Sequence, residues 1–168
     1  VRQAMYYAID VNEIIEFVCS GAGVATGTSM YPAQNTYFVP ELAERYQPDV
    51  EKAKELLAQA GYPDGFSMTI TAPSNYAQHM DTAQVIIEQL KQAGISAELV
   101  PVEWEAWVSD VYRGRDYQST VCGISADDMT AREMLVRYMS DNQKNFINFQ
   151  DEEYDSLLAQ AMAATDGG

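Results

Sequence analysis

The chain has 168 residues, 47% of them hydrophobic and 21% charged, which is the composition of one globular domain. Its 25 acidic and 10 basic residues give a net charge of −15, which argues against nucleic acid or anionic membranes as partners. No stretch approaches the roughly 20 apolar residues of a membrane span. Because the chain starts at Val1 rather than at Met, and residues 2–9 already read as the interior of a helix, residues 1–168 are expected to be one domain of a longer protein.

The first fifty residues predict two helices followed by a long loop. The helices are expected over residues 2–9 and 11–20, and Asp10 is placed to cap the second one. The loop spans residues 21–49, with one helical turn expected over 42–46. Loops of this length in compact domains are often functional or held against a neighbour. Three tyrosines are the side chains expected to hold it, namely Tyr31, Tyr37 and Tyr46.

Residues 50 to 124 predict three strands that alternate with two helices. The clearest strand runs from Phe66 to Ala72, where apolar and polar side chains alternate as in a half-buried strand. The expected elements are a helix over 50–60 capped by Asp49, the strand over 66–72, a helix closed by Gly94, a strand over 95–102, a helix ending at Gly114 and a strand over 117–124. Helical crossovers of this kind join parallel strands. The expected fold class is α/β, with a parallel βαβαβ core and flanking helices.

The last forty residues predict two more helices. Thr130 and Glu133 have the spacing of a capping box, in which the side chain of each residue accepts a hydrogen bond from the backbone N–H of the other. The apolar residues that follow helical spacing near the end are Tyr154, Leu157, Leu158, Ala161 and Met162. They form the clearest amphipathic stripe in the chain and predict a helix packed on one side.

The chain offers no recognisable catalytic constellation. His79 is its single histidine and is expected to be an exposed helix residue, so no nucleophile can be paired with a base. Cys19 and Cys122 fit no metal-binding spacing and are expected to be buried thiols rather than a disulfide. The pair Asp127 and Asp128 lacks further ligands at calcium-loop spacing. Neither a metal nor a cofactor is expected.

The stretch from residue 111 to residue 127 suggests a binding site. A helix ends at Gly114, a strand follows, and Asp127 then lies on a loop just past the carboxyl end of that strand. Open α/β sheets bind ligands at that edge. A carboxylate beside free strand backbone suits a ligand with an ammonium group. The alternative, a solvated surface loop, is common for a single acidic residue.

Several motifs with a fixed order and spacing extend over nearly the whole chain. They lie at residues 1–4, 7–10, 49–66, 90–95, 102–104, 123–127 and 148–158, the run over 49–66 being the most specific. Together they resemble the family 5 extracellular solute-binding proteins, which are the peptide-, nickel- and sugar-binding receptors of ABC importers. The resemblance implies a periplasmic-binding-protein-like lobe, the carboxyl-terminal one of a two-lobed clamp.

The resemblance also implies roles for individual residues. Asp127 stands where peptide-binding members hold the α-ammonium group of the ligand, and Trp104 stands where a tryptophan lines a side-chain pocket. The backbone of Gly123, Ile124 and Ser125 is implied to pair with an extended ligand as an added strand. The chain departs from the family pattern at Ile124, often an aromatic residue, and after Asp127, where a proline is often found.

The function implied is capture of a small solute, most simply a short peptide, by a non-enzymatic component of an ABC importer. The implied partners are the ligand, the importer's membrane subunits and the other lobe of the same chain, in a monomer that is periplasmic or extracellular and membrane-anchored. Within the family, a nickel chelate or an oligosaccharide is the alternative ligand. Two other readings stay open: a small enzyme with Asp127 or Asp128 as general base, and a purely structural α/β module.

Overall fold

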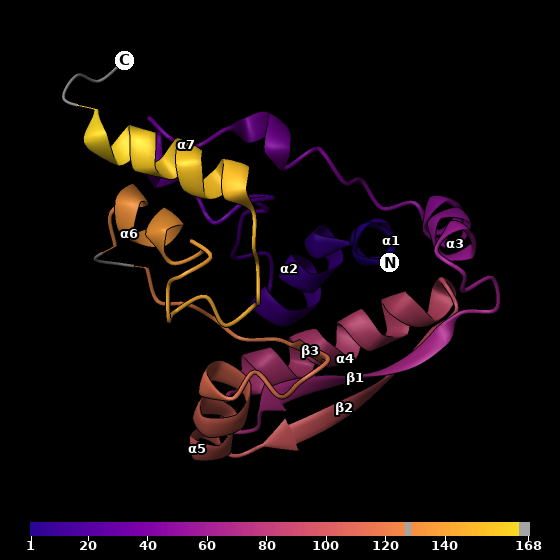
Figure 1. Ribbon diagram of the computed structural model, residues 1–168. Coiled ribbons are helices and arrows are strands. Elements are labelled where there is room, and N and C mark those ends of the chain that lie inside the picture. Colours follow the sequence, from indigo (N-terminus) through magenta and orange to yellow (C-terminus); the bar gives the residue numbers. More distant parts are fainter. Residues whose placement is uncertain (127–128, 165–168) are drawn as a thin grey trace.

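The architecture is a three-stranded sheet with helices packed on one face and an aromatic cluster on part of the other (Figure 1). The computed structural model describes residues 1–126 and 129–164. Its elements are α1 (Arg2–Ala8), α2 (Val11–Cys19), η1 (Pro32–Gln34), η2 (Pro40–Leu42), α3 (Val50–Gln59), β1 (Phe66–Pro73), α4 (Ala77–Gln92), β2 (Ile95–Val102), α5 (Trp104–Ala106), η3 (Trp107–Arg113), β3 (Ser119–Thr120), α6 (Ala131–Val136) and α7 (Glu152–Ala163). None of the helices in the described ranges is both long and apolar enough to span a membrane.

The three strands are parallel and lie in the order β2-β1-β3. The register pairs Phe66 with Ile95, Pro73 with Val102, Ile70 with Ser119 and Thr71 with Thr120. The chain passes from β1 through α4 to β2 on one side, and then through α5 and η3 to β3 on the other side of β1. The parallel βαβαβ core predicted from the sequence is therefore confirmed.

One face of the sheet is sealed by α1, α3 and α4 (Figure 1). Leu57 and Leu90 point into this layer and are 1% and 0% exposed, because each lies on the apolar side of its helix. The buried residues of this layer are Ala4, Ala8, Ala53, Leu57, Ile70, Ala72, Ala83, Leu90, Ala93 and Ile95. Short alanine side chains let α4 approach β1 and β2 closely, and let α1 pack against α3 and α4.

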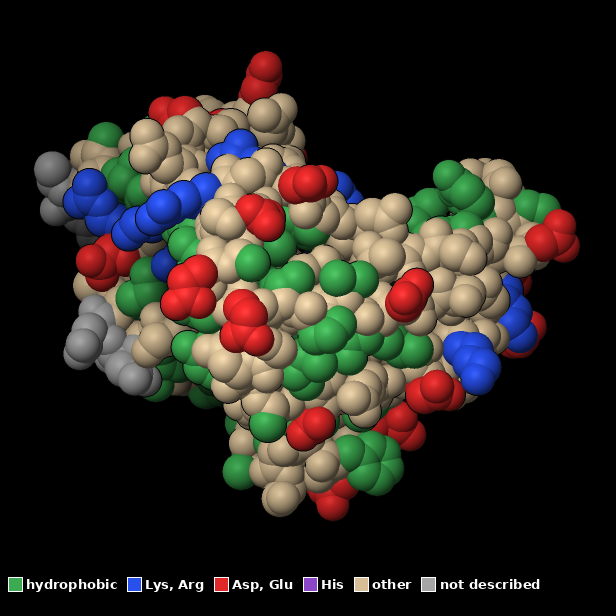
Figure 2. All heavy atoms as spheres, turned by 90° about the horizontal axis from the view of Figure 1, so that it is seen from below, with side chains coloured by type: hydrophobic (Ala, Val, Ile, Leu, Met, Phe, Trp, Pro, Cys, Tyr) green, Lys and Arg blue, Asp and Glu red, His purple; other side chains and the backbone are tan. Residues whose placement is uncertain are grey.

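Within residues 1–126 and 129–164, the opposite face of the sheet is covered near the carboxyl ends of the strands. There η3 packs against β1, and the Trp107 indole N–H donates to the Thr120 hydroxyl at 3.0 Å. Thr71 is buried, whereas Ser67 on the same face of β1 is exposed. The view of this side in Figure 2 shows acidic side chains scattered over it. The amino-terminal half of this face therefore stays open.

The caps that the sequence predicts are present. Asp10 accepts the Asn12 and Glu13 amides at the start of α2, and Asp49 accepts the Lys52 amide at the start of α3. Thr130 and Glu133 form the predicted capping box of α6. These side chains satisfy amides that would lack an intrahelical partner.

The third strand is shorter than the sequence predicts. A strand was expected over residues 117–124, but β3 covers only Ser119–Thr120. Its neighbour β1 ends at Pro73, which has no N–H to extend the ladder, so the segment after Val121 has no strand beside it. On the amino side of β3, the Thr69 N–H donates to the Gln118 side-chain oxygen at 2.7 Å and not to the backbone of a neighbouring strand.

Three smaller expectations also change. The helical turn expected over residues 42–46 lies earlier, at Pro40–Leu42, because proline favours the first position of a helix. The stripe on α7 is only partly buried, with Leu158 8% and Leu157 58% exposed. Cys19 and Cys122 are free thiols, but both are half-buried rather than fully buried.

Candidate functional site

The reversal of direction at β1 makes a topological switch point at the carboxyl edge of the sheet, where open α/β sheets are expected to have their ligand crevice. The connection after β1 runs toward β2, whereas the segment after β3 runs on the other side of β1. In open α/β sheets such a switch point, between β1 and β3 here, is where ligands bind. The residues that border it are those just after Pro73 and those just after Thr120.

A row of aromatic rings forms one side of this edge. Trp104 stacks on Trp107 with ring centroids 5.3 Å apart and planes 7° from parallel. Tyr76 meets Trp104 edge-on at 5.4 Å, and its other neighbour is His79, at 5.1 Å. Trp107 is 3% exposed and belongs to the core, whereas Trp104 is half-buried. Part of the Trp104 ring is therefore exposed at this edge, and its role in lining a ligand pocket stays a prediction.

The segment 121–126 passes this row as backbone without a neighbouring strand. Val121 donates its N–H to the Thr71 carbonyl oxygen at 3.3 Å, which is the last contact with β1. Gly123 donates its N–H to His79 Nε2 at 2.9 Å, on the side where β1 would have continued. Alternate residues of an extended chain present their backbone groups to the same side. The Gly123 backbone therefore faces the switch-point crevice.

His79 is not the exposed helix residue that the sequence predicts. It lies in the first turn of α4 and is half-buried between Tyr76 and Gly123. Since Nε2 accepts a hydrogen bond, the proton of the neutral ring is assigned to Nδ1. Among the described residues, Nδ1 is buried and has no hydrogen-bond partner. Burial lowers the pKa of this imidazole below its ordinary value.

The long loop reaches the same segment. The Tyr31 hydroxyl donates to the Ala126 carbonyl oxygen at 3.3 Å, and the Gln34 amide donates to that of Met129 at 3.4 Å. Tyr46 stacks against Tyr6 of α1 at 5.0 Å. These contacts hold the loop, as expected of Tyr31 and Tyr46, and the first two join it to Ala126 and Met129. The third tyrosine expected to hold the loop, Tyr37, is instead 61% exposed.

The predicted site residues fall into three groups. Trp104 and Gly123 come together through Tyr76 and His79. Ile124 and Ser125 are exposed on the loop that follows. Asp127 lies outside the described residues, as does Asp128, so the ammonium-binding role stays a prediction. The alternative of a general base at either position is likewise untested.

Sequence reasoning missed Tyr76, His79 and Glu103. The Glu103 carboxylate accepts the Ser74 hydroxyl at 3.4 Å, and both residues directly follow a parallel strand. Asp127 was singled out because it lies just past the carboxyl end of a strand. The same rule, applied after β1 and β2, would also have found these residues. Of the three, only His79 has a predicted place, as an exposed helix residue, and Tyr76 and Glu103 have no predicted role.

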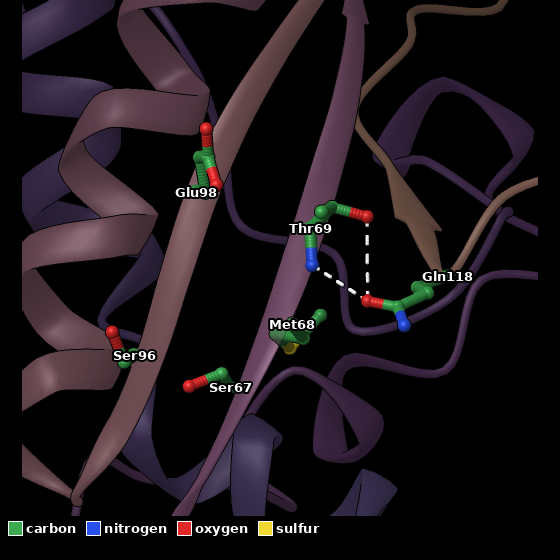
Figure 3. A pocket seen from close by; sticks show the side chains of 6 residues that line it. All are labelled: Ser67, Met68, Thr69, Ser96, Glu98 and Gln118. Carbon is green, nitrogen blue, oxygen red and sulfur yellow. Dashed lines mark hydrogen bonds between the residues drawn. The ribbon is translucent and has the colours of Figure 1, made fainter.

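A second hollow lies away from this edge, on the uncovered face of the sheet (Figure 3). Figure 3 shows that Ser67 and Ser96 border it from adjacent strands. Gln118 reaches across to Thr69, whose hydroxyl donates to the Gln118 amide oxygen at 3.3 Å. Glu98 gives this hollow a charged group, but the hollow lies at the amino-terminal half of the strands, away from their carboxyl ends and from the switch point. We therefore place the site at the carboxyl edge.

The described residues give little sign of reactive chemistry at this edge. Burial raises the pKa of the Cys122 thiol, although Arg137 opposes the rise, so the reactive thiolate is disfavoured. Within residues 1–126 and 129–164, no group of three or more His, Cys, Asp or Glu side chains could hold a metal ion. The arrangement of aromatic rings and strand backbone is suited to binding.

Comparison with known proteins agrees with this geometry. The family model described as bacterial extracellular solute-binding proteins, family 5 Middle, matches residues 1–146. Heme-binding protein A of Haemophilus influenzae is 30% identical over 98% of this chain and 31% of its own length. Di/tripeptide-binding protein 1 of Pseudomonas aeruginosa is 30% identical over 100% of this chain and 32% of its own.

Solved structures share the fold as well. A dipeptide binding protein from Pseudoalteromonas sp. SM9913, in complex with Met-Leu, superposes with a TM-score of 0.84 at 28% identity, over 98% of this chain and 34% of that one. The chain thus spans about a third of the length of the relatives it matches. Its periplasmic-binding-protein-like α/β fold agrees with theirs. The chain belongs to the bacterial extracellular solute-binding proteins of family 5.

Proposed function

We propose that this chain is one lobe of a two-lobed solute-binding protein that captures a short peptide for an ABC importer. In this proposal residues 1–168 supply one wall of the cleft, and a second lobe of the same protein closes over the ligand by a hinge motion. The protein acts outside the cytoplasm, as a monomer and without catalysis, and passes its ligand to the importer's membrane subunits. The family consists of solute-binding proteins rather than enzymes, which supports a role without catalysis.

The observation that carries the proposal is the end of β1 at Pro73, before the segment beside it ends. Beyond that point the Gly123 amide is held by the His79 side chain and not by a strand of the described residues. The main chain of an extended peptide can take the place that β1 leaves, and its hydrogen bonds do not depend on side-chain identity. This arrangement favours short peptides of varied sequence.

The other groups at the edge suit the ends and side chains of such a peptide. Trp104 presents a half-buried ring, which is suited to an apolar or aromatic side chain. Asp127 follows Ala126, which is held by Tyr31, and its carboxylate is proposed to bind the α-ammonium group. An ammonium group enclosed in a closed cleft needs a paired carboxylate, because an unpaired buried charge is costly. The name of the Pseudomonas aeruginosa relative supports a peptide ligand.

The test is Asp127→Ala in the full-length protein, with Asp128→Ala as the matched control. Isothermal titration with a free-amine dipeptide and with its N-acetylated form should separate the ammonium contact from the main-chain contacts. We expect Asp127→Ala to weaken the free-amine peptide by about 2–5 kcal/mol and the acetylated one hardly at all. Asp128→Ala should change neither much. Equal losses for both peptides would contradict the ammonium role, and absence of binding by the unchanged protein would contradict peptide capture.

A further inference from the structure

The contact between His79 and Gly123 joins two parts of the crevice that no strand connects. His79 lies in the first turn of the helix after β1, and Gly123 lies beyond β3, 44 residues later. Their hydrogen bond of 2.9 Å crosses the switch point where a ligand strand would lie. A β-carbon at position 123 would lie 3.0 Å from Nε2, so any other residue there would crowd the imidazole in its present position.

We propose that His79 holds the Gly123 amide while the site is empty and yields it to the main chain of the ligand, so that ligand binding and protonation of His79 are coupled. This inference rests on the proposed function, because it assumes a ligand whose carbonyl oxygen accepts the Gly123 N–H. It adds His79 to the site, as a residue whose hydrogen bond to Gly123 is replaced by one from the ligand. It also predicts how the affinity for the ligand depends on pH.

The geometry makes this hydrogen bond easy to exchange. While Nε2 accepts from Gly123, the ring proton resides on Nδ1, which is buried without a partner in the described part of the chain. A buried donor without a partner is unfavourable, so the hydrogen bond between Gly123 and His79 carries a free-energy cost. A ligand carbonyl oxygen that accepts the same N–H does not impose this cost. The hydrogen bond also requires a neutral ring, because a protonated Nε2 donates and cannot accept.

Few titratable groups face the imidazole from the described elements. Tyr76 comes from the start of its own helix, with its ring 5.1 Å away, and Asp81 on the same helix is exposed two positions further on. Cys122 comes from the opposite segment, where burial raises its pKa. Burial is the cause of the lowered pKa of His79, and Asp127 and Asp128 lie outside the described residues.

The direction of the coupling follows from these states. In the empty site, burial lowers the His79 pKa below its ordinary value. The accepted hydrogen bond also requires the neutral ring, because a protonated Nε2 could only donate. Once a ligand carbonyl takes the Gly123 N–H, Nε2 is free to bind a proton and the pKa rises. A ligand that raises a pKa binds more tightly in the protonated range. Affinity should therefore increase as the pH falls from about 7.5 to about 5.5, where histidine titrates.

The first experiment needs no ligand and uses the full-length protein with ¹⁵N-labelled histidine. The His79 signal is assigned by its loss in His79→Gln, and its pKa is read from the ¹⁵N shifts. We expect a lowered pKa in the unchanged protein and a higher one in Gly123→Ala, where the added methyl group crowds the ring and weakens its hydrogen bond to the amide. The same pKa in both proteins would overturn the proposal, because burial alone would then explain the shift.

The second experiment adds a saturating dipeptide of alanine, whose own groups do not titrate between about pH 5.5 and pH 7. The His79 pKa should rise, and the affinity should increase about three- to tenfold over that range. His79→Gln, which cannot be protonated, should show a flat profile. Tight peptide binding with an unchanged His79 pKa, or the same slope in His79→Gln, would overturn the proposal. If no peptide binds, the proposed function fails, while the first experiment still decides whether His79 holds the amide.

Discussion

The sealed face of the sheet and its open carboxyl edge are held together in different ways. On the sealed face, Leu57, Leu90 and Ile95 are almost fully buried, and the strands pair along their whole length. At the open edge, backbone groups without a strand partner are satisfied by side chains: Gly123 by His79 and Ala126 by Tyr31. Apolar burial therefore stabilises the first region, and exchangeable polar contacts shape the second.

The difference has a functional meaning. Burial of apolar surface stabilises the fold through contacts that have no preferred direction. A buried side chain is not readily replaced by a ligand, because a substitute must fill the same volume. A backbone amide held by one side chain can instead pass to a ligand, since the two hydrogen bonds are similar in strength. We therefore expect substitutions in the sealed layer to change stability, and substitutions at the edge to change binding.

The largest effect should come from Leu90→Ala on the sealed face. Leu90 is 0% exposed, and removing its side chain from a closed layer should lower the free energy of unfolding by about 2–5 kcal/mol. Urea denaturation of the full-length protein measures the loss, and peptide affinity of the folded protein should hardly change.

The matched variant is Trp104→Ala at the edge, which should lower peptide affinity more than it lowers the free energy of unfolding. Its half-buried ring contributes less to stability, but it lies at the crevice next to Tyr76. If Leu90→Ala weakens peptide binding as strongly as Trp104→Ala does, the two regions do not act separately.

A somewhat smaller effect is expected at the turn that precedes β1. Gly65 has φ +76°, and a β-carbon there would overlap the carbonyl oxygen of Gly94, which ends the turn before β2. Gly65→Ala should therefore cost about 2–4 kcal/mol, from left-handed strain and from displacement of the two turns.

Gly61→Ala is the control for this substitution. Gly61 has φ +89° but no atom within 4 Å of an added β-carbon, so only the strain of about 1–2 kcal/mol applies. Thermal unfolding of both variants separates the two causes. Equal losses would mean that close contact between the turns does not help to hold the sealed face.

Much of the sealed region could be predicted because its signals are local. The alternation in Phe66–Pro73, the caps at Asp10 and Asp49 and the glycine ends of the helices each lie within a few residues of the feature they predict. The boundaries of β2 agree with the sequence to the residue. Parallel pairing followed from the helices between the strands.

The edge was harder to predict because its contacts join residues that are far apart in sequence. No local pattern tells that the Gly123 amide, 44 residues after His79, would meet its imidazole, or that Pro73 would leave the third strand without a partner. The aromatic row was recognised at Trp104 only, although Tyr76 and His79 continue it. The resemblance to the family indicated the segment, but not the side chain that holds it.

The smallest predicted effect concerns the long loop. Tyr31→Phe removes the hydroxyl that donates to the Ala126 carbonyl oxygen at 3.3 Å, while it keeps the ring. The loss should be about 0.5–1.5 kcal/mol, the usual net contribution of one hydrogen bond. Because Ala126 directly precedes Asp127, we expect the loss to be seen as weaker peptide binding and faster amide exchange around residue 126, with little change in global stability.

Tyr37→Phe is the matched control, since Tyr37 lies in the same loop and its side chain is 61% exposed. It should alter neither the exchange rates nor the peptide affinity. If both variants weaken binding equally, the loop contributes through its general packing rather than through the Tyr31 hydroxyl. If neither does, the segment before Asp127 is held by the groups on its own side of the crevice, and the long loop lies outside the binding region.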